Sequence, residues 1–235
     1  TLHGSSAASD VYKRQPVVSA STAVGEALAA HTGTVRLVVD AATIETQTEN
    51  ILAETGGDAE RVIVIGAHLD SVAAGAGLND NASGSAAILE LAEELARVDH
   101  TPTNQIRFAF WGAEELGLIG STSYVSRLSD SARSDIVANL YFDMIASPNY
   151  GRFIYDGDGS PTGTAGPEGS AEIETMFVDH FDAAGLASAP TAFSGRSDYG
   201  PFIAVGIPAG GLFTGAEGRK STAEVASFGG EADVA

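Results

Sequence analysis

The sequence predicts an α/β fold in which a mainly parallel sheet is sandwiched between helices. Four apolar β-branched residues at 62–65 suit a strand that is buried on both faces. The segment 83–98 that follows has the spacing of an amphipathic helix with one apolar face. Strand and helix patterns then alternate along the chain, and this alternation is typical of parallel sheets whose strands are joined by helices.

Length, charge and composition narrow the class of protein. The 235 residues are enough for one large α/β domain, or for one domain and a piece of another. With 12 basic and 31 acidic residues the net charge is −19, which argues against a nucleic-acid partner because no basic patch can neutralise phosphates. The chain has no apolar run long enough to span a membrane, so we expect no membrane partner. It has no cysteine, which excludes disulfides and thiolate metal sites.

The residues before the central strand are β-rich and carry no recognisable chemistry. Residues 1–15 have no periodicity, and we exclude them from the fold as a leader of non-native appearance. The patterns then predict a short strand at 16–19, a capped helix at 23–30, and a strand at 35–40 that continues through 42–48. Another strand is predicted at 50–54, before a Gly-Gly-Asp turn.

The segments after the central helix continue the alternation of strands and helices. Further strands are predicted at 105–111, 140–145, 153–155 and 207–214. Helices are predicted at 116–124, 171–184 and within 197–205, and residues 156–170 form a surface loop rich in glycine, proline and serine.

Side chains suited to metal binding or acid–base chemistry follow three of the predicted strands. They are His68 with Asp70 and Asp80, Glu114 with Glu115, and Asp143. Ligands bind at the carboxyl ends of the strands in open α/β sheets. Four or five carboxylates that converge there without a counter-charge would repel one another strongly. A dinuclear metal centre would supply the missing positive charge.

The residue types and their spacing suggest a role for each side chain. Histidine nitrogen with carboxylate oxygen suits zinc, whereas all-oxygen sites suit magnesium or calcium, so calcium stays open as an additional ion. Asp80 can bridge two ions. Successive side chains diverge after a strand, so one of Glu114 and Glu115 can bind metal while the other handles the proton of the attacking water. Asp70 is placed to orient the imidazole of His68 from outside the ligand set.

Each of these residues also has a purely structural interpretation. Acidic pairs such as Glu114-Glu115 are favoured in the first turn of a helix, and Asp80 between two asparagines fits a turn or a helix cap. Asp143 is harder to explain, because a carboxylate within LYFDMI would be buried without a partner. Their joint position at strand ends favours a site. We interpret the remaining histidines as solvated: His3, His31, His100 and His180.

Several motifs, in this order and spacing, resemble the Streptomyces-type double-zinc aminopeptidases, a family that includes enzymes similar to aminopeptidases S and Y. The similar stretches are GAHLDSV at 66–72, NDNASG at 79–84, WGAEELGLIGS at 111–121, residues 139–148, GRSDY at 195–199 and GGLFTGA at 210–216. The likeness covers about residues 50–230. It implies the zinc-exopeptidase fold, which is of the phosphorylase/hydrolase-like type.

The resemblance implies a role for particular residues. It implies that His68, Asp80 and Asp143 hold one zinc and that Asp80 and Glu115 hold a second. It also implies that Glu114 is the general base and that Asp70 holds His68. It implies that the free amino group of a substrate meets the base, Asp143 and the main-chain carbonyl of Arg196. The implied side-chain pocket is lined by Met144, Ile145 and Phe202.

The implied activity is the release of amino acids, large apolar ones above all, from the N-termini of peptides or proteins. One alternative is an acyltransferase on one zinc, as in glutaminyl cyclases, which would release no amino acids. Another is a metal-dependent carboxypeptidase, for which Arg196 is the only nearby cation for the terminal carboxylate. A third is a catalytically impaired fragment that binds metal or peptide without turnover.

The resemblance also sets expectations for domain organisation and location. Residues 16–48 resemble the end of a protease-associated domain, which leaves 49–235 as the catalytic domain. In the family a Tyr-His pair, whose histidine binds the second zinc, follows the stretch resembling 228–230, and none follows here. We therefore expect a chain truncated at both ends, with a weak second zinc site. Family members are usually exported, so we expect an extracellular protein, and a monomer.

Overall fold

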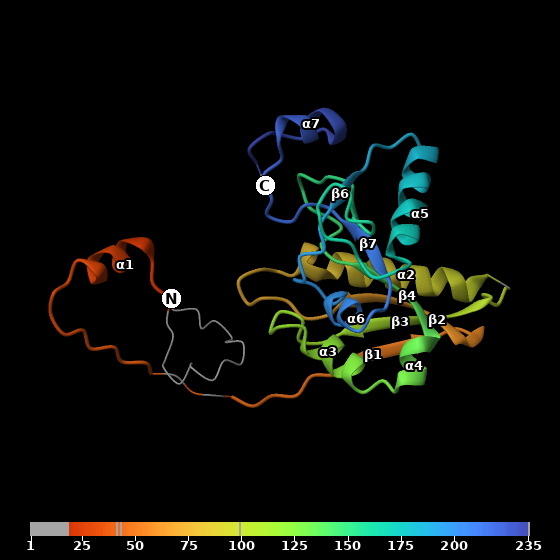
Figure 1. Ribbon diagram of the computed structural model, residues 1–235, viewed down its shortest axis with the longest axis horizontal. Coiled ribbons are helices and arrows are strands. Elements are labelled where there is room, and N and C mark those ends of the chain that lie inside the picture. The colour runs from red at the N-terminus through yellow and green to blue at the C-terminus, as the bar shows by residue number, and fades with distance from the viewer. Residues whose placement is uncertain (1–18, 41, 43, 99, 235) are drawn as a thin grey trace. The chain divides into compact units, whose positions relative to one another are not determined.

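The computed structural model describes residues 19–40, 42, 44–98 and 100–234 (Figure 1). The leader at 1–15 and most of the strand predicted at 16–19 lie outside the described residues. The chain divides into two units, Thr1–Gln47 and Thr48–Ala235. The domain boundary after residue 48 and the relation of residues 16–48 to a protease-associated domain stay predictions.

In the first unit, the predicted helix is confirmed and the predicted strand is wrong. Helix α1 spans Thr22–Ala29, and the hydroxyl of Ser21 caps it by accepting a hydrogen bond from the main-chain nitrogen of Val24. Residues 35–40 and the described residues of 42–48 have no regular secondary structure, and their apolar side chains are exposed. β-Branched residues favour a strand only where a neighbouring strand and a packed surface complete it.

The second unit is built on a seven-stranded sheet with the strand order β1-β3-β2-β4-β7-β5-β6 (Figure 1). Strands β2, β3, β4 and β7 run parallel, β1 is antiparallel to β3, and β5 is antiparallel to β7 but parallel to β6. The strands span β1 Ile51–Glu54, β2 Asp58–His68, β3 Asn104–Trp111, β4 Ile136–Phe142, β5 Phe153–Tyr155, β6 Ala189–Thr191 and β7 Ala209–Phe213.

Helices follow most strands, as the alternating patterns predict. They span α2 Gly84–Arg97, α3 Ile119–Ser126, α4 Asp130–Asp135, α5 Ser170–Ala183, α6 Gly200–Ala204 and α7 Thr222–Phe228, and an irregular helical segment, η1, spans Leu78–Ser83. Elements α4, β6 and α7 were not predicted, because each is too short to show a period. Among the described residues, no helix is long and apolar enough to cross a membrane.

Two hydrophobic clusters lie on opposite faces of the sheet, which is why β2 is apolar throughout its second half. Val62 and Val64 belong to the cluster that includes residues of α3 and α6. Ile65 and Ala67 belong to the cluster that includes Ile88 of α2. The predicted mainly parallel sheet between helices is therefore confirmed.

The parallel strands β2, β3 and β4 end at the same edge of the sheet. His68, the last residue of β2, pairs with Trp111, the last residue of β3. Asp143 follows directly after β4. The register of the sheet therefore brings the residues after these three strands together.

Candidate metal centre

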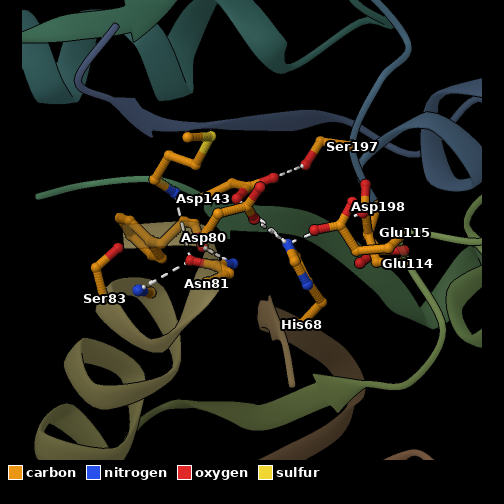
Figure 2. A network of polar contacts seen from close by, with 12 residues as sticks. His68, Asp80, Asn81, Ser83, Glu114, Glu115, Asp143, Ser197 and Asp198 are labelled. Carbon is orange, nitrogen blue, oxygen red and sulfur yellow. Dashed lines mark hydrogen bonds and ion pairs between the residues drawn. The ribbon is translucent and has the colours of Figure 1, made fainter. Parts of the chain in front are cut away.

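Three carboxylate side chains from separate segments meet around the imidazole of His68 (Figure 2). Its Nε2 atom lies 3.0 Å from Asp80 Oδ1, 3.4 Å from Asp143 Oδ1 and 3.9 Å from Glu114 Oε2. The ligand atoms of His68, Asp80 and Asp143 all lie within 4.8 Å of one another. The structure therefore brings together residues that lie up to 75 positions apart in the chain, from His68 to Asp143.

The main chain around β2 sets the orientation of His68. The imidazole is fully buried, and its Nδ1 atom lies 2.9 Å from the main-chain oxygen of Asp70. Because a carbonyl oxygen can only accept a hydrogen bond, Nδ1 carries a proton. The lone pair of a neutral imidazole then lies on Nε2, the atom that faces Asp80 and Asp143.

Asp70 does more than the sequence predicts. Its carboxylate accepts hydrogen bonds from the main-chain nitrogens of Glu114, at 2.9 Å, and Glu115, at 3.1 Å. The same carboxylate lies 3.6 Å from Nδ1 of His68, so it is the main-chain oxygen of Asp70 that contacts the ring more closely. Asp70 therefore orients the histidine and the turn that carries both glutamates.

Glu114 and Glu115 lie in a tight turn between β3 and α3, not at the start of a helix. Leu118 has φ 58° and Gly117 has φ 105°, and only glycine adopts such values without strain. The main-chain nitrogens of Gly117 and Leu118 each donate a hydrogen bond to the main-chain oxygen of Glu114 at 2.8 Å. The helix predicted from residue 116 therefore begins only at Ile119.

Asn81 joins the loop of Asp80 to the end of β4, a role that the sequence analysis missed. Its side chain is buried, donates to the main-chain oxygen of Phe142 at 3.1 Å, and accepts from the nitrogens of Gly84 and Met144 at 3.0 and 3.3 Å. A Cβ atom at Gly84 would collide with that same Phe142 oxygen. The NDNASG motif therefore holds Asp80 beside the end of β4.

Asp143 has one oxygen held by the chain and one left free. The hydroxyl of Ser197 donates to Oδ2, while Oδ1 is buried and makes no hydrogen bond. The next residue, Asp198, is also buried and accepts from the hydroxyls of Ser121 and Tyr141. No role was predicted for Ser197 or Asp198, although the GRSDY motif contains both.

The buried atoms without partners fit a bound cation. Within the described ranges, His68 Nε2, Asp143 Oδ1 and Glu115 Oε1 are buried and make no hydrogen bond. Buried polar atoms in proteins are almost always partnered, so the ligand atoms of His68 and Asp143, which make no hydrogen bond and lie within 4.8 Å of each other and of Asp80, indicate a metal site. One imidazole nitrogen with several carboxylate oxygens suits zinc.

The crowding of acidic groups changes their proton affinities. Burial is the largest effect on Glu114 and raises its pKa to about 8, and the charges of Asp198 and Asp143 act in the same direction against the opposing effect of His68. Burial lowers the pKa of His68, but its contacts with Asp143 and Asp80 outweigh this and raise the pKa to about 11. Burial, with the charge of Asp80, also raises the pKa of Glu115. The metal-free site therefore carries unbalanced negative charge.

The carboxylates open into a cavity of about 430 Å³. Met144, Tyr155, Phe213 and the exposed Arg196 also line it. The guanidinium of Arg196 lies 3.7 Å from the carboxylate of Glu217.

Two residues that were predicted to line the substrate pocket do not line this cavity. Phe202 is 0% exposed and packs in the core against Trp111, with ring centres 6.0 Å apart. Ile145 lines a separate cavity. Tyr155 and Phe213 supply the apolar surface instead.

Comparison with known proteins decides the family. Residues 50–227 match the sequence profile of peptidase family M28. The chain belongs to this family.

This M28 member is similar to curated aminopeptidases and to solved structures of other proteins. An aminopeptidase from Pseudomonas aeruginosa (strain UCBPP-PA14) is 52% identical over 200 residues, which are 85% of this chain and 37% of that protein. Leucine aminopeptidase 2 from Trichophyton equinum is 54% identical over 189 residues, 80% of this chain and 38% of that protein. A zinc aminopeptidase from Bacillus subtilis superposes with a TM-score of 0.60 at 28% identity, covering 71% of this chain and 40% of the other. The chain thus spans less than half of the length of these relatives.

Proposed function

We propose that this M28 chain carries the catalytic core of a zinc aminopeptidase of the Streptomyces type. The observation that carries the proposal is the group of unpaired buried atoms on His68, Asp143 and Glu115, with Glu114 beside it at the edge of a cavity. Two zinc ions are proposed, the first on His68, Asp80 and Asp143, and the second on Asp80 and Glu115. When bound, zinc supplies Lewis acidity for the peptide carbonyl and lowers the pKa of water.

Glu114 is the proposed general base. Its carboxylate is held at the cavity by the hydrogen bond between its own main-chain nitrogen and Asp70, and burial gives it a high proton affinity. Glu114 takes a proton from the attacking water and delivers it to the leaving amine.

The N-terminal residue of a peptide is the proposed substrate group. Its amino group would meet Glu114, Asp143 and the main-chain carbonyl of Arg196. Its side chain would enter the surface of Met144, Tyr155 and Phe213, which supports a preference for large apolar residues such as leucine. Peptide or protein N-termini are thus the proposed partners, and by resemblance we propose a secreted monomer.

The experiment combines zinc titration with peptide hydrolysis. Metal-stripped protein is titrated with zinc by calorimetry, and hydrolysis of leucyl peptides is then measured with and without an acetyl group on the N-terminus. We expect zinc binding and cleavage of the free substrate alone, because the acetyl group removes the charged amine. Glu114→Gln keeps the size of the side chain and removes its basicity, so it should lower kcat by about 10²- to 10⁴-fold.

The outcomes separate the proposal from its alternatives. Cleavage of the acetylated peptide would contradict an aminopeptidase. Cyclisation of glutaminyl peptides without release of amino acids would favour an acyltransferase. Zinc binding that Glu114→Gln leaves unchanged, together with lost hydrolysis, would support the assignment of Glu114 to proton transfer.

A further inference from the structure

We propose that Asp198 is a positioning residue whose buried negative charge strengthens zinc binding from outside the ligand set. The inference rests on the proposed metal centre, and it adds a residue to which the sequence and the family resemblance gave no role. It is carried by three features of Asp198: its burial, its hydrogen-bond partners and its place between the segments that form the site.

Burial raises the pKa of Asp198 to about 6, while two hydroxyl donors act in the opposite direction and favour its carboxylate form. The residue is 0% exposed, and each oxygen accepts a hydrogen bond from a hydroxyl, one from Ser121 and the other from Tyr141 at 2.8 Å. None of the ion pairs among the described residues involves Asp198. A buried charge without a cation is costly, so the fold holds it at the expense of stability.

The partners of Asp198 come from the segments that carry the proposed ligands. Ser121 lies in α3, which follows the turn of Glu114 and Glu115. Tyr141 precedes Asp143 by two residues on β4. Figure 2 shows Asp198 close to Glu114 and Glu115. Asp198 therefore joins the two ligand-bearing segments.

Asp198 is also covalently next to a residue that holds a ligand. Its neighbour Ser197 donates a hydrogen bond to Oδ2 of Asp143, which turns Oδ1 towards His68. Fixing Asp198 between α3 and β4 therefore fixes the position of the Ser197 hydroxyl as well. Mutation of groups that orient metal ligands in this way typically lowers metal affinity by about 10- to 100-fold.

These features predict opposite effects on two properties. In the metal-free protein, Asp198 adds a negative charge to a region already crowded with carboxylates, which lowers stability. With a divalent cation bound, the same charge is attracted to the ion, so it raises affinity. A merely structural aspartate would stabilise the protein in both states.

The Asp198→Asn variant separates the two roles because asparagine fits the same hydrogen bonds. The Oδ1 atom of the asparagine can accept a hydrogen bond from Tyr141, and its amide nitrogen can donate one to the Ser121 hydroxyl. That hydroxyl lies 3.3 Å from the main-chain oxygen of Leu118 and can donate its own proton to this oxygen. At pH 8 we expect zinc affinity, measured by calorimetric titration, to fall roughly 10- to 100-fold. The thermal midpoint of the metal-free protein should rise by about 2–4 °C.

Two matched variants control for hydrogen bonding and for burial. Tyr141→Phe removes a donor but keeps the charge, so it should lower the metal-free midpoint and change zinc affinity far less than Asp198→Asn does. Asp156→Asn alters an equally buried aspartate in the loop after β5, whose oxygens accept from Gly159 and Thr162. It should lower the midpoint and leave zinc affinity unchanged.

Two results would overturn the inference. One is a zinc affinity of Asp198→Asn within about twofold of the unsubstituted chain, which is far below the effect of an orienting group. The other is a metal-free midpoint that falls as it does in Tyr141→Phe, or failure of Asp198→Asn to fold, since either would assign Asp198 to stability alone. If the unsubstituted chain binds no zinc, the proposed function fails first, so the two failures are distinguishable.

Discussion

Two groups of ionisable residues in the second unit are spaced closely enough to hold a metal ion, but their hydrogen bonding differs. The first is His68, Asp80 and Asp143 at the ends of β2 and β4, and the second is Asp156, Asp158 and Glu174 around the loop after β5. In the first group, buried ligand atoms of His68 and Asp143 have no hydrogen-bond partner.

In the second group, the chain itself uses the carboxylates. Both oxygens of Asp156 accept main-chain hydrogen bonds, from Gly159 and Thr162. Glu174 accepts from the nitrogens of Gly157 and Asp158. The main-chain N–H of Ser160 holds the pKa of Asp158 below its usual range, whereas burial raises the pKa of Glu114 at the first group.

The comparison teaches that unsatisfied ligand atoms, not acidic spacing, mark a metal site. The carboxylates of the second group already have donors and stabilise the fold of their own loop. Those of the first group lie among more like charges than one imidazolium at His68 can balance, so an added cation would stabilise them. Each experiment below tests this difference.

The largest expected effect is on thermal stability when zinc is removed. At free zinc about 1,000-fold above its dissociation constant, binding should add about 4 kcal/mol to the free energy of unfolding. A chelator should abolish this gain, as differential scanning calorimetry would measure. His68→Ala should lose the gain, and Glu174→Gln in the second group should keep it. Equal losses in both variants would remove the distinction between the groups.

A smaller effect is expected from the residue that orients the ligands. Asp70→Asn keeps the main-chain contact with His68 but weakens the hold on the turn of Glu114 and Glu115. Zinc affinity should fall roughly 10- to 100-fold. Asp158→Asn is the matched substitution at the second group, and calorimetric titration should find its zinc affinity unchanged. A loss in that variant would show that the second group also serves the metal.

Stability of the metal-free protein should decrease as pH rises. The pKa of His68 is raised to about 11 in the folded state, so its contribution is complete below the unfolded pKa of about 6.5 and is lost as pH rises through the folded pKa. We expect the free energy of unfolding to fall by about 1–2 kcal/mol between pH 7 and 9. The raised pKa of Glu114 acts in the same direction up to about 8.

Urea denaturation at several pH values measures this dependence. His68→Ala should flatten it, and bound zinc should flatten it as well, because the ion replaces the proton on Nε2. A metal-free protein with constant stability over this range would contradict the charge imbalance inferred for the first group.

The smallest effect concerns the second group. Asp156→Asn cannot accept at both oxygens, so the N–H donors of its loop lose a partner. The free energy of unfolding should fall by about 1 kcal/mol, while peptide hydrolysis stays unchanged. Urea denaturation with a parallel activity assay measures both. A loss of activity without a loss of stability would mean that this loop contributes to the site.

The sequence predicted the second unit better than the first. The run at 62–65 has apolar residues for both faces of a sheet, and it forms the buried half of β2. The valines at 35–39 have the same strand preference but lie exposed outside any strand. Local preference decides the outcome only where neighbouring strands and helices can bury the side chains.

By itself, the sequence determined the elements and the residues that they present. Parallel strands must end at one edge, so the positions of His68, Glu114 and Asp143 after strands were enough to predict that they meet. Only the tertiary structure decided which atoms are left unpaired, that Phe202 turns into the core, and that Asp198 lies between α3 and β4. Periodicity assigns a side chain to one face of its own element. The partners of its polar atoms come from distant segments, and no local pattern encodes those contacts.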